Sequence, residues 1–188
     1  LKYDFSKTQN INYIHSAENF YSRLLSSTKY IKTEFVLLSC DDEFYLPSAI
    51  SSCVDFLIKN STYSSCGGCT IGFVKNSSEK LYGLENPPSL KGRHLNDDCP
   101  IKRAKSHFSN YAMSHLWSVT RFNKWEIICN YVFKEEYSFY AAFELQIELL
   151  TVISGKTKTL SELLWLRNLS TVPFRDSSKA SSSWSESL

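Results

Sequence analysis

The sequence predicts a single α/β domain, and three observations lead to that prediction. The run 35–38 is apolar, rich in large and β-branched side chains and followed at once by a turn, which is typical of a strand buried on both faces. Helical patterns stand on either side of this run, and a second apolar run follows the second of them. A chain of 188 residues is long enough for one such domain with a real core. We therefore expect helices packed on a central sheet.

Composition argues against several classes of partner. The formal net charge is +2 and the basic residues are scattered, so the basic stripe of a nucleic-acid-binding protein is missing. No segment approaches the roughly 20 apolar residues that span a bilayer, and the N-terminal residues lack the charged, apolar and small-residue pattern of a signal peptide. The six cysteines are spread through predicted strands and helices, as expected of reduced thiols. We expect a cytoplasmic protein without a transmembrane segment, at most peripheral at a membrane, and the sequence indicates no oligomeric state.

The N-terminal half predicts the order helix, strand, acidic turn, helix, strand. Residues 1–14 alternate like an edge strand or extended segment, and Ser16 is the predicted N-cap of a helix that ends near Thr28. After the central strand, Pro47 opens a second helix that Asn60 terminates. Residues 61–65 form a predicted polar turn, and 69–74 form a second strand.

Three consecutive carboxylates, those of Asp41, Asp42 and Glu43, follow the predicted central strand. In open α/β sheets the ligand crevice lies outside the carboxyl ends of the strands, so these side chains are predicted to reach it. Adjacent carboxylates repel one another unless they are solvated or bind a cation, and Mg²⁺ or Mn²⁺ is the usual partner. The alternative is a solvated loop that places negative charge at the start of the helix opened by Pro47.

The pair Cys66 and Cys69 has the spacing of a redox or zinc motif. A second pair is missing, however, and the motif leads into an apolar strand instead of opening a helix. We favour the alternative, in which Gly67 and Gly68 allow a close backbone approach.

Residues 75–106 form the long irregular part of the chain. Irregular connections of this length are usually functional or disordered. His94, Asp97 and Asp98 are candidates there for binding substrate or metal, although loops often carry such residues without function. A solvated loop therefore remains the alternative.

The C-terminal half predicts a strand at 114–120 that leads into Arg121, a helix at 125–133, and a longer helix at 139–153. The polar strip of the long helix is narrow and consists of Glu144, Glu148 and Thr151. It either faces solvent or lines a cleft, where an isolated carboxylate has a raised pKa suited to proton abstraction.

The last predicted element is a short helix or strand at 160–169 that carries Arg167. Beyond Pro173 serine dominates, which predicts a folded domain at 1–172 and a flexible tail at 173–188.

The order of these parts resembles the glycosyltransferases of family two and their relatives. Residues 33–47, TEFVLLSCDDEFYLP, are similar to the family block T-x-Y, hydrophobic strand, D-D-D-F-x-x-P, with Glu43 in place of the third aspartate. Three weaker similarities follow in order: 54–60 with the glycine-bearing strand after it, 117–121 to Y-x-V-x-R, and 143–145 with 155–156 to x-E-L…G-K. The resemblance covers about residues 16–170.

This resemblance implies an A-type glycosyltransferase fold with a mixed, mainly parallel central sheet flanked by helices. It also implies a nucleotide-sugar donor, with a UDP-sugar first, a glycan or other hydroxyl acceptor, and a divalent cation (Mn²⁺ or Mg²⁺). Two alternatives stay open for the family's first nucleotide-binding strand: residues 1–14 are its remnant, or the chain is truncated and lacks it. The resemblance assigns the cation to Asp41 and Asp42, with Glu43, and acceptor deprotonation in an inverting reaction to Glu144.

Arg121 and Arg167 are candidates for holding the diphosphate, with a surface ion pair or a structural anchor as the alternative for each. The acceptor is expected at the loop that carries His94, Asp97 and Asp98. Two other readings stay open. One is a non-catalytic relative that binds carbohydrate or a protein. The other is a two-metal phosphoryl- or nucleotidyl-transfer enzyme, which the sequence supports least because it has no glycine-rich phosphate loop.

Overall fold

A computed structural model describes residues 10–75, 81–85, 93–111, 114–134, 137 and 140–168 of the chain. Its helices are α1 (Phe20–Ser27), α2 (Pro47–Lys59), α3 (Pro100–Phe108), α4 (Phe122–Val132) and α5 (Tyr140–Ser154), with one 3₁₀ turn, η2 (Thr28–Tyr30). Its strands are β1 (Phe35–Val36), β2 (Phe44–Tyr45), β3 (Tyr63–Lys75), β4 (Leu81–Glu85), β5 (His94–Leu95), β6 (Val119–Arg121) and β7 (Lys156–Asn168). The predicted tail lies outside these residues, as do residues 1–9.

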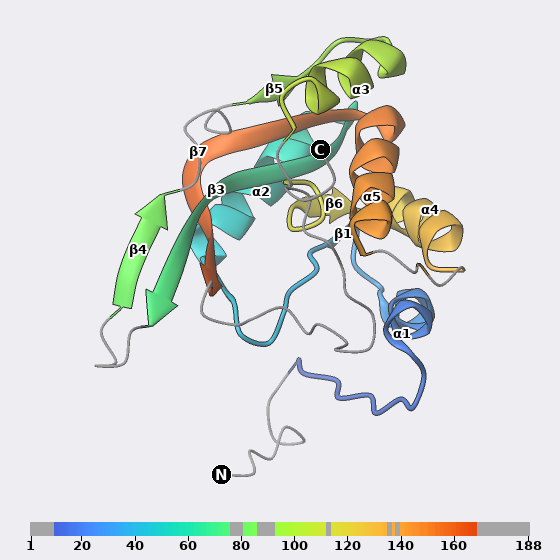
Figure 1. Cartoon of the computed structure of the whole chain (residues 1–188). Helices are drawn as coiled ribbons and strands as arrows, with labels where there is room; N and C mark the ends of the chain where they lie inside the picture. Colours follow the sequence, from blue (N-terminus) through green and yellow to red (C-terminus); the bar gives the residue numbers. More distant parts are fainter. Residues whose placement is uncertain are drawn as a thin grey trace.

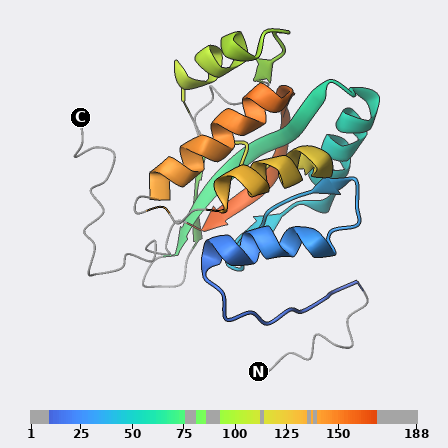
Figure 2. The ribbon, with the colours of Figure 1, turned by 90° about the vertical axis from the view of Figure 1, so that its right-hand side faces the viewer.

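The strands form one curled, mixed sheet with helices around it (Figure 1). Its order is β1-β6-β3-β7-β2, with β4 added to β3 and β5 added to β7. Figure 2 shows α5, α4 and α1 side by side on one side of the sheet, whereas α2 lies behind the sheet in the view of Figure 1. The α/β class predicted from the sequence is therefore confirmed.

The prediction of a mainly parallel sheet is wrong. Of the six strand pairings, five are antiparallel, and β3 with β7 is the parallel one. That pairing is also the longest, from Tyr63 opposite Lys156 to Phe73 opposite Asn168. It forms the spine of the sheet, and the short strands pair along its flanks.

The run 35–38 is not a central strand. Only Phe35 and Val36 pair, antiparallel to β6 at the edge of the sheet, and both are half-buried. Strand β2 lies at the opposite end of the sheet order, so residues 37–43 connect one edge to the other. The Arg121 guanidinium lies over the Phe35 ring, 5.4 Å from its centre. The acidic turn thus belongs to a connection across the curled sheet.

Local boundaries differ from prediction where side chains bond to the backbone. Helix α1 is capped by Asn19, whose Oδ1 accepts the N–H of Ser22, and not by Ser16. Strand β3 already begins at Tyr63, inside the predicted turn, and Ser64 can be buried there because its Oγ donates to the carbonyl of Thr151. Helix α3 and strands β4 and β5 lie within the region expected to be irregular. Helix α2 and the strand form of 160–168 agree with prediction.

The core lies between the sheet and its helices. Its fully buried side chains come from α2, α4, α5 and the centre of the sheet, and they include Cys53, Leu57, Leu116, Val119, Ile128, Val132, Phe143, Ile147 and Leu164. Aromatic rings line one flank, where Trp117 and Trp165 lie 5.2 Å apart. Core packing therefore fixes α5 and the end of β7, the two elements that carry the site residues described below.

Candidate active site

The acidic turn brings three potential metal ligands together. One donor atom each from Cys40, Asp42 and Glu43 lies within 4.8 Å of the others, and Asp41 is exposed beside them. Burial, together with the charges of the neighbouring carboxylates, raises the pKa of the Cys40 thiol to about 11. The thiol is therefore protonated at neutral pH, and the carboxylate oxygens, which hard divalent cations prefer, are the better ligands. The donor set fits Mg²⁺ or Mn²⁺.

Glu43 is held in place by the last residues of β7. The indole N–H of Trp165 donates to Glu43 Oε2 at 2.8 Å, and Arg167 Nε lies 3.9 Å from Oε1. Trp165 itself is fixed by stacking on Tyr45, with the rings 6.2 Å apart and nearly parallel. Burial raises the pKa of Glu43, although the Trp165 hydrogen bond and the Arg167 charge oppose the shift. A partly buried, oriented carboxylate of this kind is well suited to hold a cation.

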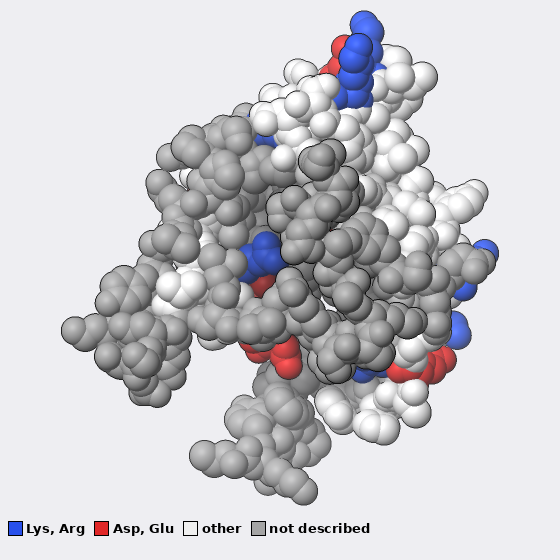
Figure 3. All heavy atoms as spheres, in the orientation of Figure 1, with Lys and Arg blue, Asp and Glu red and all other residues white. Residues whose placement is uncertain are grey.

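Arg167 lies beside Glu43, and its charge also acts on Glu144. Its side chain is 41% exposed and its guanidinium lies 5.5 Å from the centre of the Trp165 ring. Its positive charge acts to lower the pKa of both Glu43 and Glu144. Figure 3 shows Lys and Arg atoms next to Asp and Glu atoms near the centre of one face, close to where β7 ends in the same view. Arg167, one of the two predicted phosphate residues, therefore lies beside Glu43 of the predicted metal site, and its charge also acts on Glu144.

Glu144, the predicted base, lies near the start of α5 and is half-buried. Burial raises the pKa of Glu144, and the hydrogen bond from Tyr111 and the charge of Arg167 oppose the shift. The Tyr111 hydroxyl donates to Glu144 Oε1 at 2.6 Å. Sequence reasoning missed Tyr111, which is 33 residues away and carries no motif.

Arg121 does not join this group of residues. Its guanidinium donates to the backbone carbonyls of Tyr63, Leu57 and Asn60, and to Glu34 Oε1 at 3.2 Å. These contacts tie β6 to the end of α2 and the start of β3. They favour the structural anchor, which was one of the three roles considered for Arg121.

The predicted acceptor loop lies at the opposite end of β7. His94 pairs with Lys158, near the start of that strand, and shares a 2.8 Å hydrogen bond with the Tyr63 hydroxyl. Asp98 forms a 2.7 Å ion pair with Lys156, and Asp97 Oδ1 accepts the N–H of Cys99. The structure does not bring these residues near the acidic turn, and their contacts serve local structure.

The glycine pair at 67–68 lies where strands approach closely. A Cβ atom at Gly67 would lie 2.5 Å from Ser118 Oγ, and one at Gly68 would lie 2.6 Å from the backbone oxygen of Glu162. The predicted close backbone approach is confirmed. Cys66 is buried against Cys53 of α2, whereas Cys69 Sγ contacts the carbonyl oxygen of Leu160, and both are free thiols.

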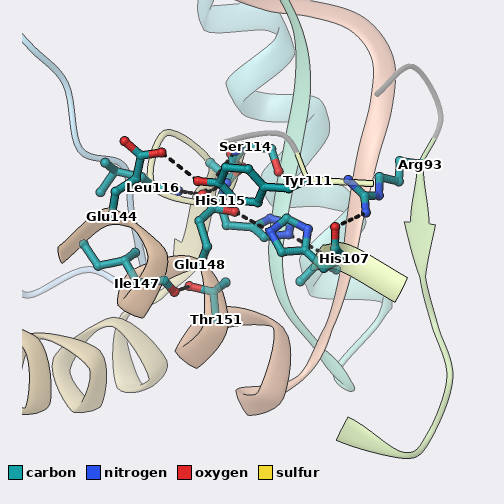
Figure 4. Close-up of polar contacts among 12 residues, drawn as sticks. Arg93, His107, Tyr111, Ser114, His115, Leu116, Glu144, Ile147, Glu148 and Thr151 are labelled. Carbon is teal, nitrogen blue, oxygen red and sulfur yellow. Dashed lines mark hydrogen bonds and ion pairs between the residues drawn. The ribbon is translucent and has the colours of Figure 1, made fainter. Parts of the chain in front are cut away.

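A second cluster of polar residues, which the sequence did not reveal, lies in the core next to Glu144 (Figure 4). Glu148 is completely buried, and its Oε1 accepts the backbone N–H groups of Ser114, His115 and Leu116 at 3.1, 2.7 and 3.1 Å. Its Oε2 lies 2.9 Å from Nε2 of His107, which is also buried. This carboxylate therefore organises the turn that precedes β6.

The pKa of Glu148 reflects these donors. Burial acts to raise the pKa, but His115, His107 and the Leu116 N–H outweigh burial and hold the pKa of Glu148 below its usual range. His115 behaves differently, because burial lowers its pKa to about 4 and leaves the imidazole neutral. Thr151, the third member of the predicted polar strip, is also buried and donates to the carbonyl of Ile147. Most of the strip thus faces the core, and neither solvent nor an open cleft.

A small hollow lies between this cluster and the acidic turn. It is lined by Trp165, Trp117, Ser114 and Ser118 among others, and has room for about one water molecule. Within the described part of the chain, Ser114 Oγ and Trp117 Nε1 have no hydrogen-bond partner although both are buried. Polar atoms of this kind are usually satisfied by ordered water or by a ligand.

Comparison with known proteins adds no family assignment, because no protein-family model and no curated protein sequence matches this chain. None of the helices in the described ranges is both long enough and apolar enough to cross a lipid bilayer.

Proposed function

We propose that this chain transfers a sugar from a nucleotide-diphosphate donor, with a UDP-sugar first, to a hydroxyl group of a glycan or another acceptor. The observation that carries the proposal is the contact of Arg167 with the acidic turn, where its Nε lies 3.9 Å from Glu43 Oε1. Its charge also acts to lower the pKa of Glu144 on α5. Metal ligands, a phosphate-binding cation and a carboxylate with a raised pKa are the three groups that such a transfer needs.

Each residue has a distinct role in this proposal. Asp42 and Glu43, with Asp41 beside them, hold a divalent cation, which neutralises charge on the leaving diphosphate when it is bound. Arg167 donates to phosphate oxygens as a planar fork. Its 41% exposure leaves the guanidinium accessible to a ligand.

Glu144 removes the proton of the acceptor hydroxyl as its oxygen attacks the anomeric carbon. The new C–O bond forms while the bond from the anomeric carbon to the phosphate oxygen breaks, and the nucleoside diphosphate leaves with that electron pair. Attack from the face opposite the leaving group inverts the anomeric centre. Tyr111 orients Glu144 through its 2.6 Å hydrogen bond.

A non-catalytic carbohydrate- or protein-binding relative is the second candidate. The edge position of β1 and the mostly antiparallel sheet favour it, because they depart from the mainly parallel sheet that the enzyme family implies. Such a protein would keep the acidic turn as a binding feature without turnover.

Calorimetry with UDP and Mn²⁺ tests donor binding. We expect UDP to bind the wild-type chain in the presence of Mn²⁺ and to lose most of its affinity when EDTA replaces the metal. Asp42→Asn should weaken binding about tenfold or more, since it removes a charged ligand. Asp55→Asn, an exposed carboxylate on α2, is the matched control and should bind as wild type does. Absence of Mn²⁺-dependent binding, or equal binding by both variants, would refute the donor site.

Turnover separates the two candidates. With a panel of UDP-sugars and release of UDP as the signal, Glu144→Gln should lower the rate about 100-fold or more while UDP affinity stays within about twofold. Glu126→Gln, on the exposed side of α4, should not change the rate. Donor binding without any turnover by the wild-type chain would favour the non-catalytic candidate.

A further inference from the structure

We propose that His107, His115 and Glu148 form a buried zinc site. The three side chains come from α3, from the turn before β6 and from α5 (Figure 4). One donor atom of each lies within 4.8 Å of the other two. The proposal does not depend on the acidic turn or on glycosyl transfer.

The donor atoms lie close to zinc-binding positions. Zinc takes imidazole nitrogen and carboxylate oxygen at about 2.0–2.2 Å, so its tetrahedral ligands lie about 3.3 Å apart. His107 Nε2 and Glu148 Oε2 are already 2.9 Å apart, and the rings of His107 and His115 lie 4.9 Å apart at an angle of 36°. Small side-chain rotations would therefore complete the three contacts. Two histidines and a carboxylate are an established zinc ligand set, in which a water takes the fourth position.

Glu148 is prepared to act as a one-oxygen ligand. Its Oε1 is occupied by three backbone N–H groups, and its Oε2 points at His107 Nε2. Metal-bound carboxylates are usually held by donors in this way, which orients the remaining oxygen. The backbone donors thus serve as the outer shell of the site.

Both histidines offer nitrogen atoms that the protein itself uses poorly. His107 is completely buried, and its Nε2, the nitrogen that faces Glu148 Oε2 at 2.9 Å, makes no well-aligned hydrogen bond with the described residues. His115 Nε2 has only a 3.5 Å contact with Thr157 Oγ1, which leaves that nitrogen weakly satisfied. A buried nitrogen without a partner costs free energy, and coordination of an ion would remove that cost.

The charges around the cluster suit one divalent ion with nitrogen ligands. Glu148 supplies one negative charge, and Glu144, which is hydrogen-bonded to Tyr111, lies one turn before it on α5. Among the described residues, Arg93 places a positive charge near the cluster. Its guanidinium donates to the carbonyls of Asn110, Ser106 and His107 and not to the Glu148 carboxylate. Imidazole ligands favour zinc over Mg²⁺ or Mn²⁺. An enclosed position means that the ion enters as the chain folds.

Metal analysis tests the site. The wild-type chain, folded in the presence of zinc and then desalted, should hold one zinc ion per chain. When cobalt replaces zinc, the protein should show the strong visible absorption of a tetrahedral cobalt centre. His107→Gln should lower zinc affinity at least about 100-fold. His15→Gln, an exposed histidine outside the cluster, should bind zinc as wild type does. Asp42→Asn should also retain the ion, which excludes the acidic turn as its position.

A second measurement applies even if a variant fails to fold. For the wild-type chain, removal of zinc with a chelator should lower the melting temperature, and one equivalent of zinc should restore it. The proposal is overturned if the folded wild-type chain takes up neither zinc nor cobalt, if the chelator leaves the melting temperature unchanged, or if Asp42→Asn removes the ion while His107→Gln, folded, keeps it.

Discussion

Two successive turns of α5 carry the same residue type in opposite states. Glu144 and Glu148 are one helical turn apart, so their side chains project from the same side of the helix. Glu144 is half-buried and its pKa is raised, mainly by burial. Glu148 is completely buried, yet its pKa is lowered.

The difference shows that neighbouring charges and hydrogen-bond donors together can outweigh burial. Glu148 receives three backbone N–H groups and faces His107, whereas Glu144 accepts the Tyr111 hydroxyl as its one hydrogen-bond donor among the described residues. A carboxylate with all its donors is stable as an anion and inert as a base. The less satisfied one is available to take a proton. One turn of α5 thus carries the candidate base, Glu144, and the next turn carries a structural carboxylate, Glu148.

The largest expected effect is the loss of stability in Glu148→Gln. The amide removes the charge that strengthens three backbone hydrogen bonds and places an N–H₂ group against His107 Nε2. We expect the free energy of unfolding to fall by about 3 kcal/mol. Urea denaturation in the presence of a chelator measures this change without any contribution from zinc.

Glu144→Gln is the matched variant for that experiment. It should change the free energy of unfolding by less than about 1 kcal/mol at pH 7, because the environment of Glu144 already disfavours its charge. Equal losses of stability in Glu148→Gln and Glu144→Gln would contradict the difference between the two carboxyl groups.

The second expected effect compares Arg103, at the C-terminal end of α5, with Arg167, beside the acidic turn. Arg103 is buried and donates to four carbonyls, those of Val152, Ile153, Asp97 and Asp98, so it closes the C-terminal end of α5. Arg103→Ala should cost about 2 kcal/mol of stability because these acceptors lose their donors.

Arg167→Ala should cost about 0.5 kcal/mol or less, since its ion pair with Glu43 is long and partly exposed. It should instead weaken UDP binding about tenfold. Thermal unfolding and calorimetry on both variants give the comparison. A large stability loss in Arg167→Ala with unchanged UDP binding would make Arg167 structural.

Periodicity predicted α2 and α5 well, because their apolar patterns and the terminators Pro47 and Asn60 act locally. It missed α3, which lies in a region that the sequence predicts to be irregular. The same local pattern misplaced residues 35–38, because a short apolar run looks alike in sequence whether it lies at the edge or in the centre of a sheet. Which strands pair in parallel depends on long-range contacts that no short pattern encodes.

The sequence predicted only those parts of the candidate site whose residues are neighbours in the chain or lie on one helix. The acidic turn is contiguous in sequence, and the narrow polar strip of α5 pointed to Glu144. His107 and His115 meet Glu148 from more than 30 residues away and carry no motif, so their cluster emerges only from the fold. One signal was present: a strip of two glutamates and a threonine is too narrow for a solvent-facing side of a helix.

Trp165→Phe gives the third effect and sharpens the role of the acidic turn. Phenylalanine keeps a ring against Tyr45 and Trp117 but loses the N–H that orients Glu43. Stability should fall by about 1 kcal/mol, and Mn²⁺ affinity should fall about tenfold.

Trp117→Phe is the control for this change, because Trp117 Nε1 has no hydrogen-bond partner in the described part of the chain. Its Mn²⁺ affinity should stay within about twofold of wild type. If both variants lose Mn²⁺ equally, packing and not the Glu43 hydrogen bond holds the site.

The smallest effect is the pH dependence that Glu144 imparts. Its folded-state pKa lies above its ordinary value of 4.5, so the folded chain favours the protonated form. That preference adds stability below the ordinary value and is lost as pH rises through the folded value. Glu144→Gln lacks this loss, so the variant should gain about 0.5 kcal/mol over wild type as pH rises from about 4 to 7. Urea denaturation at several pH values checks the sign. A variant that becomes less stable than wild type with rising pH would mean that Glu144, like Glu148, is stabilised as an anion, and it could then not serve as the base.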